Sequence, residues 1–268
     1  MTDVMLRVHL SAGYGRTTIL DEVSFDLQPG RILGFVGVSG AGKSTLVLAL
    51  MDLLRFRGGW SRGEVLLDGK NLIGMREREA RQLRGNRIAL VPQSPSSALN
   101  HAISLRSHFE EAWRAHNSSG SKDLDARLSE LLFEVQLPAD TEFLSRRPGS
   151  ISVGQAQRIM IALALLHRPA VLIADEPTSA LDPITQAGVL ALLRKIVTVT
   201  GTALLYISHD FISVLQLCDE LAVLDAGTIT EQLPVAEIGK RIHGSALQQL
   251  LATLPVPPAV LLEYRGGF

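Results

Sequence analysis

Gly37–Val38–Ser39–Gly40–Ala41–Gly42–Lys43–Ser44 is a glycine-rich segment between an apolar run, Ile32–Val36, and a helix-prone segment, Thr45–Leu54. Strand, glycine-rich turn and helix in this order are typical of a phosphate-binding loop. The glycines let successive backbone N–H groups point at phosphate oxygens, and the helix N-terminus adds its positive dipole end. We expect Lys43 to reach the β- and γ-phosphates, Ser44 to ligate Mg²⁺, and Thr45 to complete the site. A glycine-rich turn with a chance lysine is the alternative.

A second segment, Val171–Leu172–Ile173–Ala174–Asp175–Glu176, is an apolar run that ends in two adjacent carboxylates. Two anions at the end of a buried strand are costly unless a cation or a reaction uses them. Asp175 is placed to hold Mg²⁺, directly or through water, and Glu176 to activate an attacking water. Taken alone, the pair could equally cap the following helix. The phosphate-binding loop upstream favours the catalytic interpretation.

Strand and helix patterns alternate around these motifs, which predicts an α/β fold with a parallel sheet and helices on both faces. Residues 94–157 differ, because apolar residues recur there at helical spacing from Leu124 to Val135. We therefore expect a core formed by residues 1–93 and 158–233, an inserted helical subdomain at 94–157, and a C-terminal tail at 234–268. Within the core the pattern predicts strands at Val4–Leu10, Val23–Leu27, Glu64–Asp68, Ile88–Val91, Ala203–Ile207 and Leu221–Leu224, helices at Thr185–Val197 and Phe211–Leu217, a turn at Gly13–Gly15, and a solvated helix or loop at Arg76–Arg87.

The composition excludes several classes of protein. Of 268 residues, 46% are hydrophobic and 20% charged, so the chain is not intrinsically disordered. The net charge of -1 argues against nucleic acid as a partner. A single cysteine, Cys218, excludes an internal disulfide framework, a four-cysteine zinc site and an iron–sulfur cluster held by this chain alone. No apolar run approaches the ~20 residues that cross a bilayer, and the N-terminus does not resemble a secretion signal.

Two further motifs complete a recognisable order. Ser152–Val153–Gly154–Gln155 precedes an apolar helix, and Asp175–Glu176–Pro177–Thr178–Ser179–Ala180–Leu181–Asp182 follows it. With the phosphate-binding loop, this order resembles the nucleotide-binding subunits of ABC transporters, from about Val4 to Gly227. The resemblance implies a P-loop NTPase core of the ABC type with antiparallel strands near the N-terminus. It also implies ATP and Mg²⁺ as cofactors and ATP hydrolysis as the reaction.

Carried over residue by residue, the resemblance assigns four more roles. Tyr14 resembles the aromatic residue that stacks on adenine, and Gln93 the glutamine that senses Mg²⁺ and links the helical subdomain to the site. Asp182 resembles the aspartate at the dimer contact, and His209 the histidine that contacts the γ-phosphate. The alternatives are an ordinary turn aromatic for Tyr14, a plain polar loop residue for Gln93 and a structural histidine for His209.

The Ser152–Gln155 motif departs from the family pattern at Val153, where a glycine is usual. Ser152 and Gly154 remain to offer a hydroxyl and a backbone N–H to the γ-phosphate held by an opposite subunit, and the resemblance also places Gln155 among the nucleotide-binding residues. The branched Val153 restricts the backbone and crowds that approach, and Ala156 replaces a usually polar residue. We expect the composite site served by this motif to be weakened, whereas this subunit's own loop keeps Glu176 and His209.

A narrower resemblance concerns the stretch from Gln93 to Asn100, which is similar to the oligopeptide, dipeptide and nickel importer branch of the family. The tail from His243 to Pro255 fits that branch loosely. This resemblance implies a second, different ATPase subunit, two membrane permease subunits and an extracytoplasmic substrate-binding protein as partners. It places the chain peripherally at the cytoplasmic face of the inner membrane. Peptide, nickel and metal chelate all remain open as cargo.

Two other functions stay open on the sequence. One is an ATPase subunit of a soluble ABC-type assembly, such as the complex that cleaves carbon–phosphorus bonds, whose ATPase subunits resemble the same branch. The other is a catalytically weak regulatory subunit of a heterodimer, which Val153 would favour. A kinase or GTPase leaves the Ser152–Gln155 motif unexplained.

Overall fold

The structure is a computed structural model that describes residues 4–117 and 121–238. At the centre of the described part lies a six-stranded sheet whose strand order is β10-β9-β3-β8-β7-β6. The five strands from β9 to β6 run parallel to one another, and β10 pairs antiparallel with β9 at one edge. The mainly parallel α/β fold is confirmed. The strands are β3 (Ile32–Val36), β6 (Ile88–Val91), β7 (Val171–Asp175), β8 (Ala203–Ile207), β9 (Glu220–Asp225) and β10 (Thr228–Pro234).

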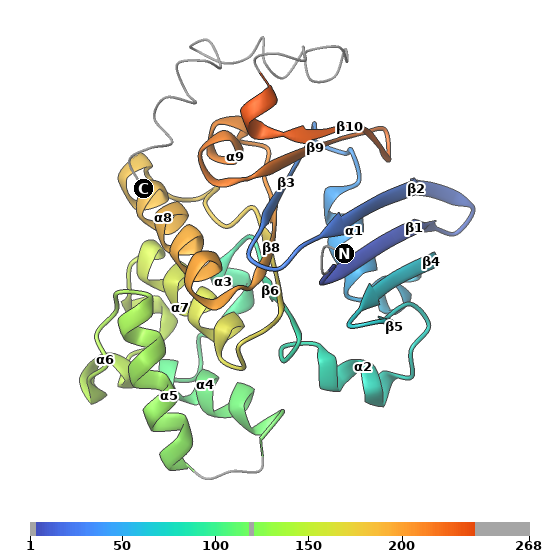
Figure 1. The fold of residues 1–268 in the computed structure, drawn as a ribbon. Coiled ribbons are helices and arrows are strands. Elements are labelled where there is room, and N and C mark those ends of the chain that lie inside the picture. Colours follow the sequence, from blue (N-terminus) through green and yellow to red (C-terminus); the bar gives the residue numbers. More distant parts are fainter. Residues whose placement is uncertain (1–3, 118–120, 239–268) are drawn as a thin grey trace.

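A second sheet is antiparallel, with the order β2-β1-β4-β5 among the described residues (Figure 1). The turn predicted at Gly13–Gly15 begins later than predicted, at Gly15, because Tyr14 still pairs with Thr17 and with Gly59. Irregular pairing between Leu10 and Gly13 lets the strand continue past the glycine, and the chain turns only after Tyr14. The strands are β1 (Leu6–Tyr14), β2 (Thr17–Leu27), β4 (Gly59–Leu67) and β5 (Lys70–Asn71).

Helices account for most of the remaining described chain. The predicted segment 94–157 contains helices and no strand in its described part, and α7 runs across the predicted boundary at residue 157. The tail motif His243–Pro255 lies outside the described residues. The helical elements are α1 (Lys43–Leu50), η1 (Leu54–Arg57), α2 (Glu77–Leu83), α3 (Pro95–Ala98), α4 (Leu105–Arg114), α5 (Ser121–Glu134), α6 (Thr141–Ser145), η2 (Pro148–Ser150), α7 (Val153–Leu165), α8 (Pro183–Thr200), α9 (Phe211–Leu217) and η3 (Val235–Glu237).

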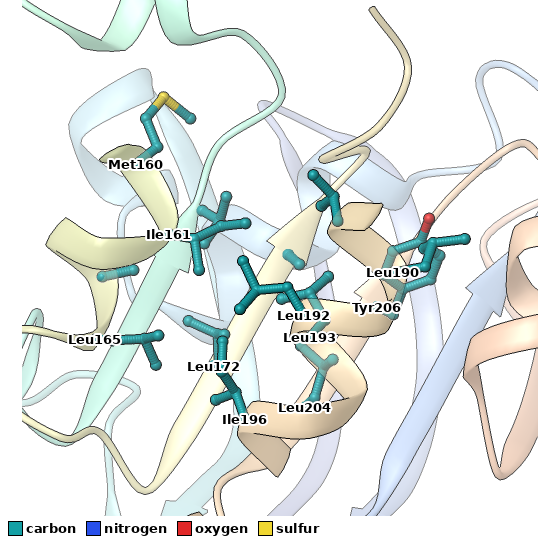
Figure 2. Close-up of a cluster of buried hydrophobic side chains, with 14 of the residues drawn as sticks. Met160, Ile161, Leu165, Leu172, Leu190, Leu192, Leu193, Ile196, Leu204 and Tyr206 are labelled. Carbon is teal, nitrogen blue, oxygen red and sulfur yellow. The ribbon is translucent and has the colours of Figure 1, made fainter. Parts of the chain in front are cut away.

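The parallel sheet separates two hydrophobic cores, because successive side chains of a strand point to opposite faces. On β3, Ile32 and Val36 belong to the core with α7, α8 and α9, whereas Leu33 and Phe35 belong to the core with α1 and the antiparallel sheet. Figure 2 shows the first core, where leucines of α8 pack between β7, β8 and α7. Strands buried on both faces explain the continuous apolar runs in the sequence.

Strand direction brings the motif-bearing loops together. The glycine-rich loop follows β3, Gln93 follows β6, Glu176 follows β7 and His209 follows β8. These four strands are parallel neighbours in the sheet, so their carboxyl ends lie along one edge. In open α/β sheets that edge is where ligands bind.

Candidate nucleotide-binding site

The glycine-rich loop wraps around the side chain of Lys43. Lys43 Nζ donates hydrogen bonds to the carbonyl oxygens of Gly37 at 2.7 Å and Val38 at 3.1 Å. Burial lowers the pKa of Lys43, while the charges of Glu176 and Asp175 oppose that shift. The ammonium group therefore lies within the curved loop, near the carboxylates of Asp175, at the end of β7, and of Glu176, just after it.

Two glycines of the loop are required by its geometry. Gly42 has a φ of 106°, a conformation that residues with a Cβ atom rarely adopt. At Gly37 a Cβ atom would lie 2.3 Å from the carbonyl oxygen of Leu224 on β9, which is impossible without moving the backbone. Gly42 is also the N-cap of α1, so the loop leads directly into a helix N-terminus. That terminus is suited to bind an anion.

Two other predicted site residues, Gln93 and His209, contact the carboxylate of Glu176. Its Oε2 atom accepts a hydrogen bond from Gln93 Nε2 at 2.9 Å and lies 3.0 Å from His209 Nδ1. Glu176 has a φ of 46°, and its backbone N–H donates to the carbonyl oxygen of Ile207 at 2.8 Å. This unusual backbone conformation directs the carboxylate away from β7 toward the loops that follow β6 and β8.

Asp175, the residue before Glu176, is a partly buried carboxylate. Burial and, to a smaller extent, the charge of Glu176 raise its pKa to about 6, although the charge of Lys43 opposes both effects. A carboxyl group in this position gains from a cation beside it. Hydroxyl and carboxylate oxygens are the ligands that Mg²⁺ prefers, and it takes few of them because phosphate and water supply the rest. Ser44 and Asp175 therefore fit a magnesium ion, with Gln93 as a third candidate ligand.

Ser44 and Gln93 line an open cavity of ≈ 790 Å³. Ile19 of β2 forms part of its wall, and sequence analysis missed this residue because a half-buried isoleucine on a strand carries no functional signal. Asp175 is not among the residues that line the cavity. The predicted residues that do line it are Tyr14, Ser39, Gly40, Gly42, Lys43, Ser44, Thr45, Gln93, Glu176 and His209.

Gly37 and Ala41 of the glycine-rich loop do not line the cavity either. The other predicted residues lie outside it, on a surface that we call the signature surface, residues 152–155 and 182–185. Ser152 and Gln155 form a reciprocal capping box at the start of α7, with hydrogen bonds of 3.2 and 3.0 Å. Asp182 caps α8 by accepting from the backbone N–H groups of Ile184 and Thr185. The two helix ends are packed together, because a Cβ atom on Gly154 would lie 2.7 Å from Thr185 Cγ2.

The signature surface presents apolar side chains to solvent. Val153 is 54% exposed and Ile184 is 86% exposed. Ala156 is buried within α7, so a small apolar residue suits that position. The loop cavity and the signature surface are therefore two separate regions of this chain, since no residue of the signature surface lines the cavity.

Comparisons with known proteins agree with this geometry. The sequence profile of the ABC transporter family matches residues 20–179. The probable D,D-dipeptide transport ATP-binding protein DdpD of Escherichia coli is 39% identical to this chain, and the alignment covers 87% of this chain and 72% of the length of DdpD. The dipeptide transport ATP-binding protein DppD of Caldanaerobacter subterraneus is 37% identical, over 84% of this chain and 69% of its own.

A solved structure extends the likeness to the fold. The structure of cbiO1 from Clostridium perfringens, described as part of the ABC transporter complex cbiONQ, superposes with a TM-score of 0.76. It is 25% identical and covers 94% of this chain and 96% of its own. Within the described residues, no helix is both long enough and apolar enough to span a bilayer. The chain belongs to the ABC transporter family and is an ATP-binding ATPase of that family.

Proposed function

We propose that the chain hydrolyses ATP to drive uptake of peptides through an ABC importer. The observation that carries the proposal is the convergence of Gln93 and His209 on Glu176 at the mouth of the loop cavity. The two relatives are described as a probable D,D-dipeptide transport and a dipeptide transport ATP-binding protein, which supports peptide as the cargo class. Nickel or a metal chelate is the second cargo class that the sequence left open.

The geometry supports a division of labour around the γ-phosphate. The loop N–H groups and Lys43 hold the phosphates, and Tyr14, which lines the same cavity, offers a ring for adenine. Glu176 accepts a proton from the attacking water, and His209, beside it, stabilises charge that develops on the γ-phosphate. Bound Mg²⁺ would neutralise phosphate charge, and Ser44, Asp175 and Gln93 are the residues that would hold it.

Completion of the site requires a second subunit. The signature surface lies outside this chain's cavity, so Ser152, Gly154 and Gln155 would act on ATP held by a partner, with Asp182 at the contact. We propose that the partner is a different ATPase chain with an unaltered signature. Both chains would sit at the cytoplasmic face of the membrane beneath two permease subunits, fed by an extracytoplasmic binding protein.

Replacement of Glu176 tests the catalytic assignment. In the assembled complex, Glu176→Gln should keep ATP binding and slow turnover by at least ~10²-fold, because the general base is lost. The matched control is Glu64→Gln, since Glu64 is exposed on the antiparallel sheet, and it should turn over at the normal rate. Near-normal turnover by Glu176→Gln would remove Glu176 from this role.

A transport assay tests the cargo. Cells that express the Glu176→Gln chain in place of the native one should lose uptake of radiolabelled dipeptides and keep uptake of nickel. Loss of nickel uptake with normal dipeptide uptake would assign the chain to metal import instead.

A further inference from the structure

Four hydroxyl groups form a buried chain behind the site. Tyr206, on β8, is completely buried, and Thr178, Ser208 and Ser213 are each at least 95% buried. Tyr206 Oη lies 3.2 Å from Thr178 Oγ1 and 3.0 Å from Ser213 Oγ, and Ser213 Oγ lies 3.3 Å from Ser208 Oγ. Figure 2 shows the Tyr206 ring against Leu190 of α8, at the end of the hydrophobic core.

The direction of each hydrogen bond follows from the number of protons. Ser213 Oγ donates to the carbonyl oxygen of Asp210 at 2.7 Å, so it accepts from Tyr206 and from Ser208. The Tyr206 proton is thereby used, and Thr178 must donate to Tyr206. Burial raises the pKa of Tyr206 to about 12, so the hydroxyl stays protonated. The chain of donors runs in one direction, from Thr178 to the carbonyl of Asp210.

The two ends of this series of hydrogen bonds lie in the two loops that supply Glu176 and His209. Thr178 is two residues after Glu176, and Ser208 and Asp210 flank His209. Ser208 Oγ also accepts the backbone N–H of Asp210 at 3.0 Å, so both neighbours of His209 are held. The 3.0 Å approach of His209 to Glu176 therefore depends on the relative position of two loops that Tyr206 joins.

We propose that Tyr206 is a positioning residue for ATP hydrolysis, whose hydroxyl fixes the loop of Glu176 against the loop of His209. The inference rests on the proposed roles of those two residues. Tyr206 is not among the residues that line the cavity. Its hydroxyl should consequently affect the rate of the chemical step and leave ATP affinity unchanged.

The test measures kcat and KM for ATP in the purified assembled complex. Tyr206→Phe removes the hydroxyl and keeps the ring, and we expect kcat to fall about tenfold with KM for ATP within about twofold. Thr178→Val removes the other end of the same link and should lower kcat equally. Thr178→Ser keeps the hydroxyl and should restore kcat. The double variant Tyr206→Phe/Thr178→Val should be no slower than either single variant, because both break one link.

Thr202→Val is the matched control. Thr202 is a buried hydroxyl just before the other end of β8, where its Oγ1 donates to the carbonyl oxygen of Pro169 at 3.0 Å. Its loss should reduce thermal stability about as much as Tyr206→Phe does, and kcat should not change. A lower stability with an unchanged kcat for Tyr206→Phe would show a structural role and overturn the inference, as would a rise in KM alone.

Two outcomes separate this inference from the proposed function. If Glu176→Gln is slow and both Tyr206→Phe and Thr178→Val turn over normally, the inference fails and the proposed function stands. If Glu176→Gln turns over normally, the proposed function fails, and the inference fails with it. Should Tyr206→Phe not fold, the Thr178→Val and Thr178→Ser pair decides alone.

Discussion

The carboxyl group of Asp175 ties folding stability to pH at the level of one residue. Its pKa, about 6 in the folded protein, exceeds the ordinary value of 3.8, so the folded protein holds this proton more tightly than the unfolded chain does. The free energy of unfolding should therefore fall as pH rises from about 4 to about 6, because the partly buried carboxyl group loses its proton. Above pH 6 this loss of stability is complete. The full shift corresponds to ~3 kcal/mol, and solvent contact reduces it to about 2 kcal/mol.

Asp175→Asn removes that penalty because the amide is neutral at every pH. We expect the variant to be more stable than the native chain by about 2 kcal/mol at pH 7, and the difference to vanish near pH 4. Urea unfolding from pH 4 to pH 7.5 measures it, with Asp21→Asn, a change of an exposed carboxylate, as control. A stability difference that does not vary with pH would contradict this origin.

Single residues also show where prediction from sequence succeeds. The convergence of Lys43, Gln93 and Glu176 was predictable, because each follows a parallel strand and such strands end at one edge. The positive φ of Glu176 was not predictable, because it depends on a hydrogen bond to Ile207, 31 positions away in the sequence. The donor chain through Tyr206 was also missed, since a tyrosine within an apolar strand is typical of a core residue.

Among the elements, α7 depends on its N-terminal capping box. Ser152→Ala removes the side-chain acceptor for the backbone N–H of Gln155, and we expect a loss of about 1 kcal/mol in the free energy of unfolding. Ser152→Asp keeps an acceptor and places negative charge at a helix N-terminus, so stability should be retained. Urea unfolding of both variants checks this; a Ser152→Asp variant as unstable as Ser152→Ala would argue against the capping role.

The same pair separates folding from function. The aspartate at position 152 would repel a γ-phosphate presented by the partner subunit, so Ser152→Asp should lower ATP turnover of the complex despite its normal stability. If Ser152→Asp folds and turns over normally, the signature surface does not contact phosphate.

Elements with a strong hydrophobic pattern were predicted best. The buried strands and the helix with Leu124, Leu128 and Leu131 match the structure, because burial fixes the spacing of their apolar residues. The edge strand β10 was missed, since its residues are mostly polar or half-exposed. Helix α1 begins at Lys43, earlier than predicted, because the phosphate-binding loop ends inside its first turn.

For the whole molecule, two separate cores meet at the parallel sheet. One joins the sheet to α1 and the antiparallel strands, and the other joins it to α7, α8 and the helical segment. The loop cavity belongs to the first side and the signature surface to the second. ATP bound by one subunit would therefore meet the signature surface of another only if two subunits face each other.

Such an assembly should depend on the exposed apolar side chains of the signature surface. Ile184, near the start of α8, is 86% exposed, and Val199, near its end, is 74% exposed. Burying a charge without a partner is costly, so Ile184→Asp should weaken ATP-dependent association with the partner subunit by about tenfold or more. Val199→Asp places the same charge on the same helix away from this surface and should associate normally. Each substitution is combined with Glu176→Gln, which should keep ATP bound, and light scattering measures association with the partner subunit. Equal association of the Ile184→Asp and Val199→Asp variants would place the subunit contact elsewhere.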